Sequence, residues 1–276
     1  MSNITDYNEV SRSYDSVRKA PDAHILKGLM ENLTGKNTED LDIIDIGCGT
    51  GNYSEYFFQF EPRSLCLMDA SEGMLNKAKA KLTASCRTQL SFKQAVLPVI
   101  PYEDNSFDAG MINHVLHHIQ KNPNGKSFPA VVQTLNETHR ILKPGGVLTI
   151  IAETPENLEG NWYTNLVPET TKRWRNILPT HKQIKRMLEE SGFSLKSTYK
   201  TLMASYLPNY DNLEGPLHES WRNVNSFWSL CTEAEIQNMK QNLTQIKNEG
   251  TLQAYFEKHD KIYSVGAYDI FAAIKL

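Results

Sequence analysis

Residues 41–51 constrain the fold of this chain more than any other stretch. They are Leu-Asp-Ile-Ile-Asp-Ile-Gly-Cys-Gly-Thr-Gly, an apolar run that ends in three glycines at alternate positions. Such a run predicts a buried strand that turns sharply into a helix. Gly47, Gly49 and Gly51 lack the Cβ atoms that would keep a ligand away from the backbone, and they permit positive φ angles. The turn therefore predicts a binding floor, and the helix after it, from about Tyr53, directs free N–H groups toward polar or anionic ligand groups.

The glycine spacing separates two classes of ligand. A dinucleotide-binding turn has the pattern G-x-G-x-x-G, whereas here Gly51 is followed by Asn52. Asp45 and the D-x-G-x-G-x-G string instead resemble the class I methyltransferases that use S-adenosylmethionine, of the type that acts on small molecules. The resemblance extends over roughly residues 14–193. It implies an α/β fold with a Rossmann-like, seven-stranded, mostly parallel sheet, whose last strand is antiparallel, and helical cap insertions.

The resemblance also implies which residues hold the cofactor. Asp69 ends the next apolar run, Leu65–Ala70, and at the tip of that strand its carboxylate can accept hydrogen bonds from both ribose hydroxyls. Ser71 is better suited than Asp69 to cap the following helix, and Met74 is expected near the adenine, with plain core packing as the alternative. The predicted cofactor residues are Tyr14, Arg18, Asp45, Gly47, Cys48, Gly49, Gly51, Asp69, Ala70, Met74, Val96, Leu97, Asn113 and His114.

Two pairs of these cofactor residues, Tyr14 with Arg18 and Val96 with Leu97, are predicted from the resemblance alone. In similar enzymes a Tyr-Asp segment before the first helix covers the cofactor, so Tyr14 and Arg18 are expected over its methionine end, with a frayed terminus as the alternative. In the segment 91–108, Val96 occupies the position where the family commonly has an Asp that binds the adenine amino group. Backbone groups of Val96 and Leu97, or water, would have to make that contact.

Histidines follow the fourth predicted strand, residues 109–113. The strand delivers them to the carboxyl edge of the sheet, where open α/β sheets bind ligands. A histidine that titrates near neutrality suits a general base for a hydroxyl or a protonated nitrogen. Adjacent residues of a helix or strand face different ways, so at most one of His117 and His118 is expected to point at the substrate. We predict His117 as this base, because it follows the fourth strand where the acceptor must meet the methyl group, with His118 as the alternative. Structural roles for both remain open, and an acid or thiol acceptor would need no base.

One compact domain is predicted. Residues 1–30 form an N-terminal lid and first helix, 31–153 form the cofactor-binding core, and 154–276 carry the cap with strands six (194–203) and seven (262–276).

The segment between the last two predicted strands is far longer than a hairpin needs, which indicates a functional excursion. A capping box at Thr232–Glu235 opens an amphipathic helix there. We predict a cap over a small-molecule acceptor, although ordinary packing or a dimer contact would also explain its aromatic residues. The predicted substrate residues are Tyr7, His117, Trp162, Tyr163, Trp174, Tyr206 and Trp221.

The composition of the chain narrows the choice of substrate class, compartment and rival function. With 29 basic and 32 acidic residues and no basic cluster, a nucleic-acid substrate is disfavoured. Four cysteines without C-x-x-C spacing fit a reducing compartment, and no metal site is predicted. A polar N-terminus and the lack of a long apolar run predict a cytoplasmic protein. A nicotinamide-dependent oxidoreductase is disfavoured by Asn52, whereas a non-catalytic protein that binds S-adenosylmethionine as regulator or scaffold remains open.

Overall fold

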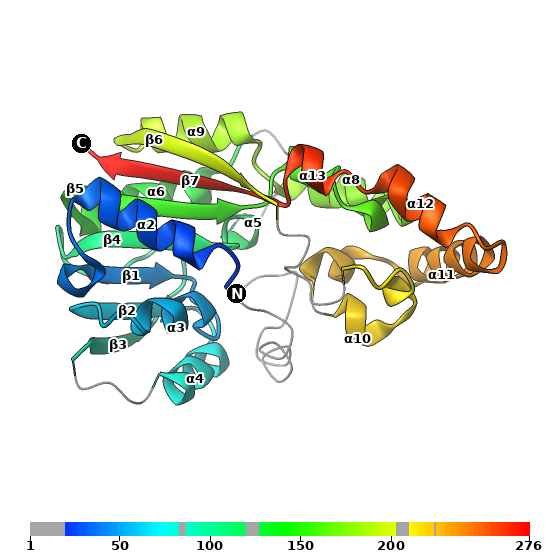
Figure 1. Cartoon of the computed structure of the whole chain (residues 1–276). Coiled ribbons are helices and arrows are strands. Elements are labelled where there is room, and N and C mark those ends of the chain that lie inside the picture. Colours follow the sequence, from blue (N-terminus) through cyan, green and yellow to red (C-terminus); the bar gives the residue numbers. More distant parts are fainter. Residues whose placement is uncertain (1–19, 83–86, 120–126, 203–209, 224) are drawn as a thin grey trace.

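A single seven-stranded sheet is the centre of the structure, a computed structural model that describes residues 20–82, 87–119, 127–202, 210–223 and 225–276. The strands are β1 Asp42–Ile46, β2 Ser64–Asp69, β3 Gln89–Gln94, β4 Phe107–Asn113, β5 Leu142–Ala152, β6 Phe193–Thr201 and β7 Tyr268–Lys275. Their order is β3-β2-β1-β4-β5-β7-β6 (Figure 1). β7 pairs antiparallel with β5 and β6, and the other pairs are parallel. The predicted Rossmann-like architecture is therefore confirmed.

Helices cover both faces of the sheet because strand side chains alternate between two apolar cores. Ile44 and Ile46 of β1 face one core, and Ile43 between them faces the other. The first core is covered by α5 (Leu116–Ile119), α6 (Pro129–Ile141) and α9 (His181–Glu190). The second is covered by α2 (Ala23–Thr34), α3 (Asn52–Phe58) and α4 (Glu72–Lys81), and a short η2 (Thr38–Asp40) leads into β1.

The cap lies beyond the carboxyl ends of the parallel strands (Figure 1). Its apolar residues form a third core, separate from the two on the sheet, in which Trp162, Trp174 and Phe227 are fully buried. The predicted capping box at Thr232 is present. The cap elements are α7 (Pro155–Leu158), η3 (Trp162–Leu166), α8 (Pro168–Ile177), η5 (Gly215–Leu217), α10 (Glu219–Arg222), η6 (Ser226–Leu230), α11 (Glu233–Asn248), α12 (Leu252–His259) and α13 (Ile262–Val265).

Two predicted strand boundaries were wrong. The last strand was expected from residue 262, but α13 occupies 262–265, and Gly266, at a φ of 83°, separates this helix from β7. The fifth strand was expected from Val147 after a turn, but β5 already begins at Leu142, with an irregular pairing opposite Phe107 and Ala109. In both cases pairing with a distant strand set the boundary, which local pattern does not encode.

Buried polar groups join the cap to the sheet. Asp269, at the start of β7, accepts a hydrogen bond from Asn157 Nδ2 of α7 at 3.3 Å, and its other oxygen lies 2.7 Å from His181 Nδ1 of α9. Asn157 Nδ2 also lies 3.3 Å from the carbonyl oxygens of Val265 and Gly266. Asn157 is fully buried and Asp269 is 2% exposed. These bonds therefore hold α7, α9 and the start of β7 together at the boundary between cap and sheet.

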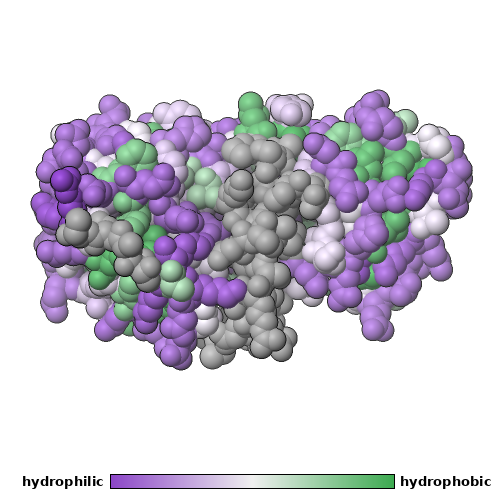
Figure 2. Space-filling view, turned by 60° about the horizontal axis from the view of Figure 1, so that its bottom comes forward, coloured by the Kyte–Doolittle hydropathy of each residue, from purple (hydrophilic) through white to green (hydrophobic). Residues whose placement is uncertain are grey.

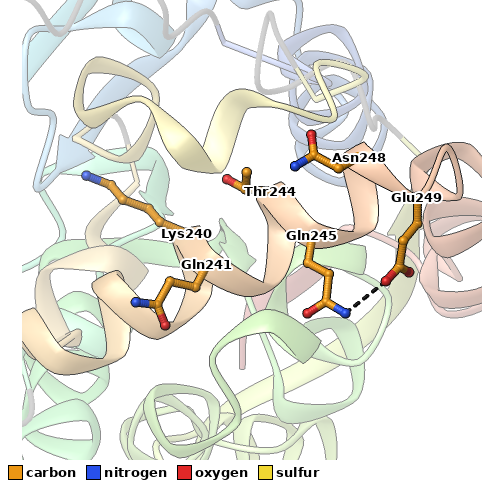
Figure 3. A pocket seen from close by; sticks show the side chains of 6 residues that line it. All are labelled: Lys240, Gln241, Thr244, Gln245, Asn248 and Glu249. Atoms are coloured by element: carbon orange, nitrogen blue, oxygen red, sulfur yellow. Dashed lines mark hydrogen bonds between the residues drawn. The ribbon is translucent and has the colours of Figure 1, made fainter.

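The outer face of α11 borders an open hollow of about 560 Å³ (Figure 3). All the side chains around it are polar and come from this one helix, whereas Met239 and Leu243 on the opposite face are buried. Ligand sites are usually concave and mostly apolar, with convergent polar groups from several elements. The hollow is open and lined by one helix only, without convergent groups from other elements, and is therefore a solvated helix face. The residues around it are Lys240, Gln241, Thr244, Gln245, Asn248 and Glu249.

Candidate active site

The turn after β1 has the conformation that its three glycines predict. Gly47, Gly49 and Gly51 have φ angles of 76°, 55° and 79°, a region that other residues rarely adopt. A Cβ atom on Gly47 would lie 2.5 Å from Val115 Cγ2, and one on Gly51 would lie 3.1 Å from Ala78 Cβ. The space beside Gly49 is open. The outer glycines are thus required by close packing, and the middle one leaves the backbone accessible to a ligand.

Asp69 connects the tip of β2 to this turn. Its Oδ2 accepts a hydrogen bond from Gly49 N at 2.9 Å, and its Oδ1 accepts one from Ser71 N at 2.8 Å. Burial raises the pKa of this carboxyl, and the backbone hydrogen bonds oppose the rise. Ser71 caps α4 by accepting from Met74 N at 3.2 Å, as predicted. Each oxygen of Asp69 keeps a lone pair beyond its backbone bond, which two ribose hydroxyls could use.

Asp45 supports the same turn from below. It is 2% exposed and accepts a hydrogen bond from Ser54 Oγ at 2.7 Å. Burial raises its pKa to about 7, and the nearby negative charge of Asp69 contributes to this rise. Burial also raises the pKa of the Cys48 thiol well above its usual value. Asp45 therefore holds β1 against α3 and supports the glycine turn from its buried side.

The end of β4 lies beside the glycine turn, because β4 pairs directly with β1. The strand order reverses between these two strands, and ligands of open α/β sheets bind at such a switch point. Asn113, the last residue of β4, is 8% exposed, and within the described residues neither polar atom of its amide has a hydrogen-bond partner. A buried amide without partners costs free energy. This orphaned group therefore indicates the position of a ligand.

These features fit S-adenosylmethionine, the cofactor that the sequence resemblance implies. An open glycine backbone, a carboxylate at the next strand's tip and a buried amide meet at one edge of the sheet. Val96, two residues beyond β3, is 50% exposed on the same edge, where the backbone contact to adenine was predicted. Met74 is 2% exposed and packs in the core beside this edge. The individual contacts to the cofactor stay predictions.

The two candidate bases lie together on α5. The ring centroids of His117 and His118 are 3.9 Å apart, although adjacent positions were expected to diverge. The two rings on the four-residue helix α5 thus lie against each other, and the expectation that they would face different ways was wrong. His117 also packs on Trp174, at 5.1 Å between centroids, and Trp174 Nε1 donates to Glu153 Oε2 at 2.7 Å. Sequence reasoning missed Glu153, although it directly follows the buried strand β5.

The described aromatic residues of the predicted substrate set lie in the core of the cap. Trp162, Tyr163, Trp174 and Trp221 are each at most 6% exposed. They pack edge to face, with the ring of Tyr163 5.5 Å from that of Trp221 and 6.0 Å from that of Trp162. Their contact with substrate stays a prediction. The other predicted residues on the acceptor and lid side, Tyr7, Tyr14, Arg18 and Tyr206, lie outside the described residues.

The described residues contain neither a candidate metal site nor a candidate membrane span. No group of three or more His, Cys, Asp or Glu side chains in these parts of the chain could hold a metal ion. None of the helices in the same ranges is long and apolar enough to cross a membrane.

Known proteins resemble this chain in sequence and fold. A methyltransferase domain model matches residues 44–150. A demethylmenaquinone methyltransferase of Lactococcus lactis is 27% identical over 199 residues, which cover 67% of this chain and 73% of that protein. A tRNA U34 carboxymethyltransferase of Nautilia profundicola is 26% identical over 159 residues, 57% of this chain and 49% of that protein.

A solved structure shares the whole architecture. It is a putative methyltransferase from an antibiotic biosynthesis pathway of Anabaena variabilis, with a TM-score of 0.66 at 17% identity, covering 92% of this chain and 97% of that one. At this identity the likeness concerns the fold. The methyltransferase domain matched over residues 44–150, with the glycine turn inside it, identifies a class I methyltransferase domain that uses S-adenosylmethionine.

Proposed function

We propose that this enzyme methylates a small organic acceptor bound between the carboxyl edge of the sheet and the cap. The observation that carries the proposal is the buried amide of Asn113, which lacks a hydrogen-bond partner within the described residues. The chain leaves the sheet for the cap from the same edge, after Ala152 and after Thr201. A polar group of the cofactor or the acceptor would satisfy the amide there.

Charge supports a small acceptor over a nucleic acid. The net charge is −3, and proteins that hold a phosphate backbone do so with clustered Lys and Arg. Figure 2 shows hydrophilic residues spread over sheet and cap alike, with hydrophobic ones between them. Of the two relatives described above, the one named for demethylmenaquinone is thus the better guide than the one named for tRNA. We propose an acceptor that is at least partly apolar.

The chain's residues would act mainly by alignment and by exclusion of water. When bound, the cofactor supplies a methyl group on a positively charged sulfur, and its transfer is an in-line displacement. Proximity and desolvation can supply most of the rate of such a step. The glycine turn and Asp69 would hold the cofactor, and the cap, anchored through Trp174 to Glu153, would cover the acceptor. His117 as base, with His118 as the alternative, stays a prediction from the sequence.

The proposal also includes three predictions made from the sequence. They are the division of the chain after residues 30 and 153, the N-terminal lid over the cofactor, and the cytoplasmic location. The cysteines at 48, 66 and 231 are free, which agrees with a reducing compartment. The proposed acceptor contacts are Tyr7, His117, Trp162, Tyr163, Trp174, Tyr206 and Trp221.

A labelled-methyl screen tests the proposal. The enzyme is incubated with S-adenosylmethionine carrying a deuterated methyl group and, separately, with a metabolite extract or total tRNA, and products are detected by mass spectrometry. We expect a labelled small molecule, and we expect Asp69→Ala to lower its yield at limiting cofactor. Label in tRNA alone would refute the small acceptor. Tight binding of S-adenosylhomocysteine without any labelled product would favour the regulatory or scaffold alternative.

A further inference from the structure

Arg222, the last residue of α10, is a buried cation in the cap. It is 8% exposed, although Lys, Arg, Asp and Glu are almost never buried to this extent unless they are paired. Within the described residues its guanidinium makes one hydrogen bond, from Nη1 to Pro216 O at 2.7 Å, and no carboxylate pairs with it. Burial of an unpaired charge costs free energy. Arg222 therefore indicates the binding of a negatively charged group.

The other charges in this part of the cap do not neutralise Arg222. Burial raises the pKa of the Cys231 thiol, on which the charges of Glu235, Arg173 and Arg222 also act. The carboxylate of Glu235 pairs with Arg173 and accepts a hydrogen bond from Thr170 Oγ1 at 3.1 Å. The acid of this group is thus balanced by the other arginine, and the charge of Arg222 remains.

A second buried donor lies six residues further along the chain. Trp228, in η6, is 5% exposed, and its indole N–H has no hydrogen-bond partner within the described residues. A buried indole N–H is normally hydrogen-bonded. The ring of Trp228 packs on that of Trp221, the residue before Arg222, at 5.8 Å between centroids. One short segment of the cap therefore buries two side chains that can donate hydrogen bonds to an anion.

The chemistry of Arg222 favours a carboxylate over a phosphate. Because Nη1 bonds Pro216 O, the edge formed by Nε and Nη2 can make the two parallel hydrogen bonds that carboxylates form with arginine. One guanidinium balances the single charge of a carboxylate, whereas a phosphate monoester carries nearly two charges at neutral pH. The buried aromatic rings of the same segment exclude water, which strengthens such a charged hydrogen bond.

The segment that carries Arg222 is connected to the edge of the sheet where the cofactor is expected. Figure 1 shows α10 in the cap, beyond the carboxyl ends of the parallel strands. Phe227 of η6 packs on Trp174 at 6.1 Å between centroids, and Trp174 packs on His117, which follows β4, at 5.1 Å. The aromatic core of the cap therefore extends from the neighbourhood of Arg222 to the end of β4.

We propose that the cap binds the carboxylate of a small organic acid, which Arg222 holds through Nε and Nη2 and to which Trp228 donates its indole N–H. The expected source of the carboxylate is the methyl acceptor, and this part of the inference rests on the proposed function. A second ligand of the cap is the other source. The binding site itself depends only on the residues of the cap, so the tests below separate the two sources.

The first test needs no turnover. The full chain with S-adenosylhomocysteine is incubated with a metabolite extract, or with the same extract after conversion of its carboxyl groups to methylamides, and retained compounds are identified by mass spectrometry. We expect a carboxylic acid to be retained from the untreated extract and to be lost after amidation. Arg222→Met should retain it at least about tenfold less. Absence of any acid whose retention depends on Arg222, or retention of phosphates or neutral compounds instead, would overturn the proposal.

Control variants separate binding from folding and from net charge. Arg175→Met removes an arginine of α8 that pairs with Glu159 near the surface, and retention should stay within about twofold. Arg222→Lys keeps the charge but loses the planar fork, so retention should fall several-fold with a Tm within about 4 °C of the native value. Trp228→Phe, which keeps a ring but no N–H, should also lower retention several-fold. A Tm lowered by more than about 10 °C in Arg222→Lys, or an equal loss of retention in Arg175→Met, would overturn the proposal.

The labelled-methyl screen decides the source of the carboxylate. We expect the retained acid to gain the label, and we expect Arg222→Lys to raise its KM while affinity for S-adenosylhomocysteine, measured by calorimetry, changes less than about threefold. A retained acid without label, beside another compound that is labelled, would refute its assignment to the acceptor and leave the site standing. A labelled product without any retained acid would overturn the site and leave the proposed function standing. A retained acid without any labelled product would do the reverse.

Discussion

Replacement of Asp69 should affect both stability and cofactor binding, because its carboxylate has two kinds of contact. In Asp69→Ala the backbone N–H groups of Gly49 and Ser71 lose acceptors at 2.9 and 2.8 Å. Hydrogen bonds to charged groups contribute about 1.5–3 kcal/mol each. Water can replace part of both at the open Gly49, and burial already disfavours the charge. We therefore expect a net loss of about 1–3 kcal/mol, or roughly 2–10 °C in Tm.

The effect on the cofactor is separable from the effect on stability. Loss of a charged hydrogen bond to the ribose should weaken binding by about 1.5–3 kcal/mol, roughly 10- to 150-fold in Kd. Asp69→Asn should be intermediate, because its amide keeps one acceptor oxygen but presents N–H groups to the second backbone donor. Glu72→Ala is the matched control, since it removes the same charge from an exposed position three residues away.

Calorimetric titration with S-adenosylhomocysteine and thermal unfolding of the apo protein measure the two effects. A lowered Tm with Kd within twofold of the native value in Asp69→Ala would mean that Asp69 only supports the turn. The ribose assignment would then be wrong. An equal loss of affinity in Glu72→Ala would instead attribute the effect to net charge.

Three further perturbations test other parts of the structure. Gly49→Val should abolish S-adenosylhomocysteine binding in calorimetry, because a β-branched residue resists the φ of 55° and would fill the open space; native affinity would contradict the binding floor. The pKa of Asp45 rises from 3.8 to about 7 on folding, so the stability it supports is present below about pH 4 and is lost as pH rises to about 7. Asp45→Asn should therefore gain stability relative to the native protein between pH 4 and pH 8, by up to ~4 kcal/mol, and a constant difference in urea unfolding would refute this. Asn157→Leu should cost about 2–4 kcal/mol, because Asp269 and the carbonyls of Val265 and Gly266 lose a donor; an unchanged unfolding midpoint would show that these hydrogen bonds do not stabilise the fold.

Much of the cofactor site follows from short stretches of sequence. The positive φ angles at 47, 49 and 51, the Ser71 cap and the capping box at Thr232 were predictable. Each depends on the conformational preferences of one residue or on contacts within a single turn. The apolar runs predicted the individual strands, whereas the seven-stranded sheet and its antiparallel last strand were implied by the resemblance to class I methyltransferases.

The tertiary structure decided which side chains from distant parts of the sequence are in contact. Asn157 and Asp269 meet across 112 positions, and Trp174 reaches Glu153 only once α8 packs beside the end of β5. The ring of His114 lies against the hydroxyl of Tyr53, 61 positions away, a contact that no local pattern predicts. Local geometry is set by neighbours in the chain, whereas burial, charge and proton position depend on groups that folding brings together.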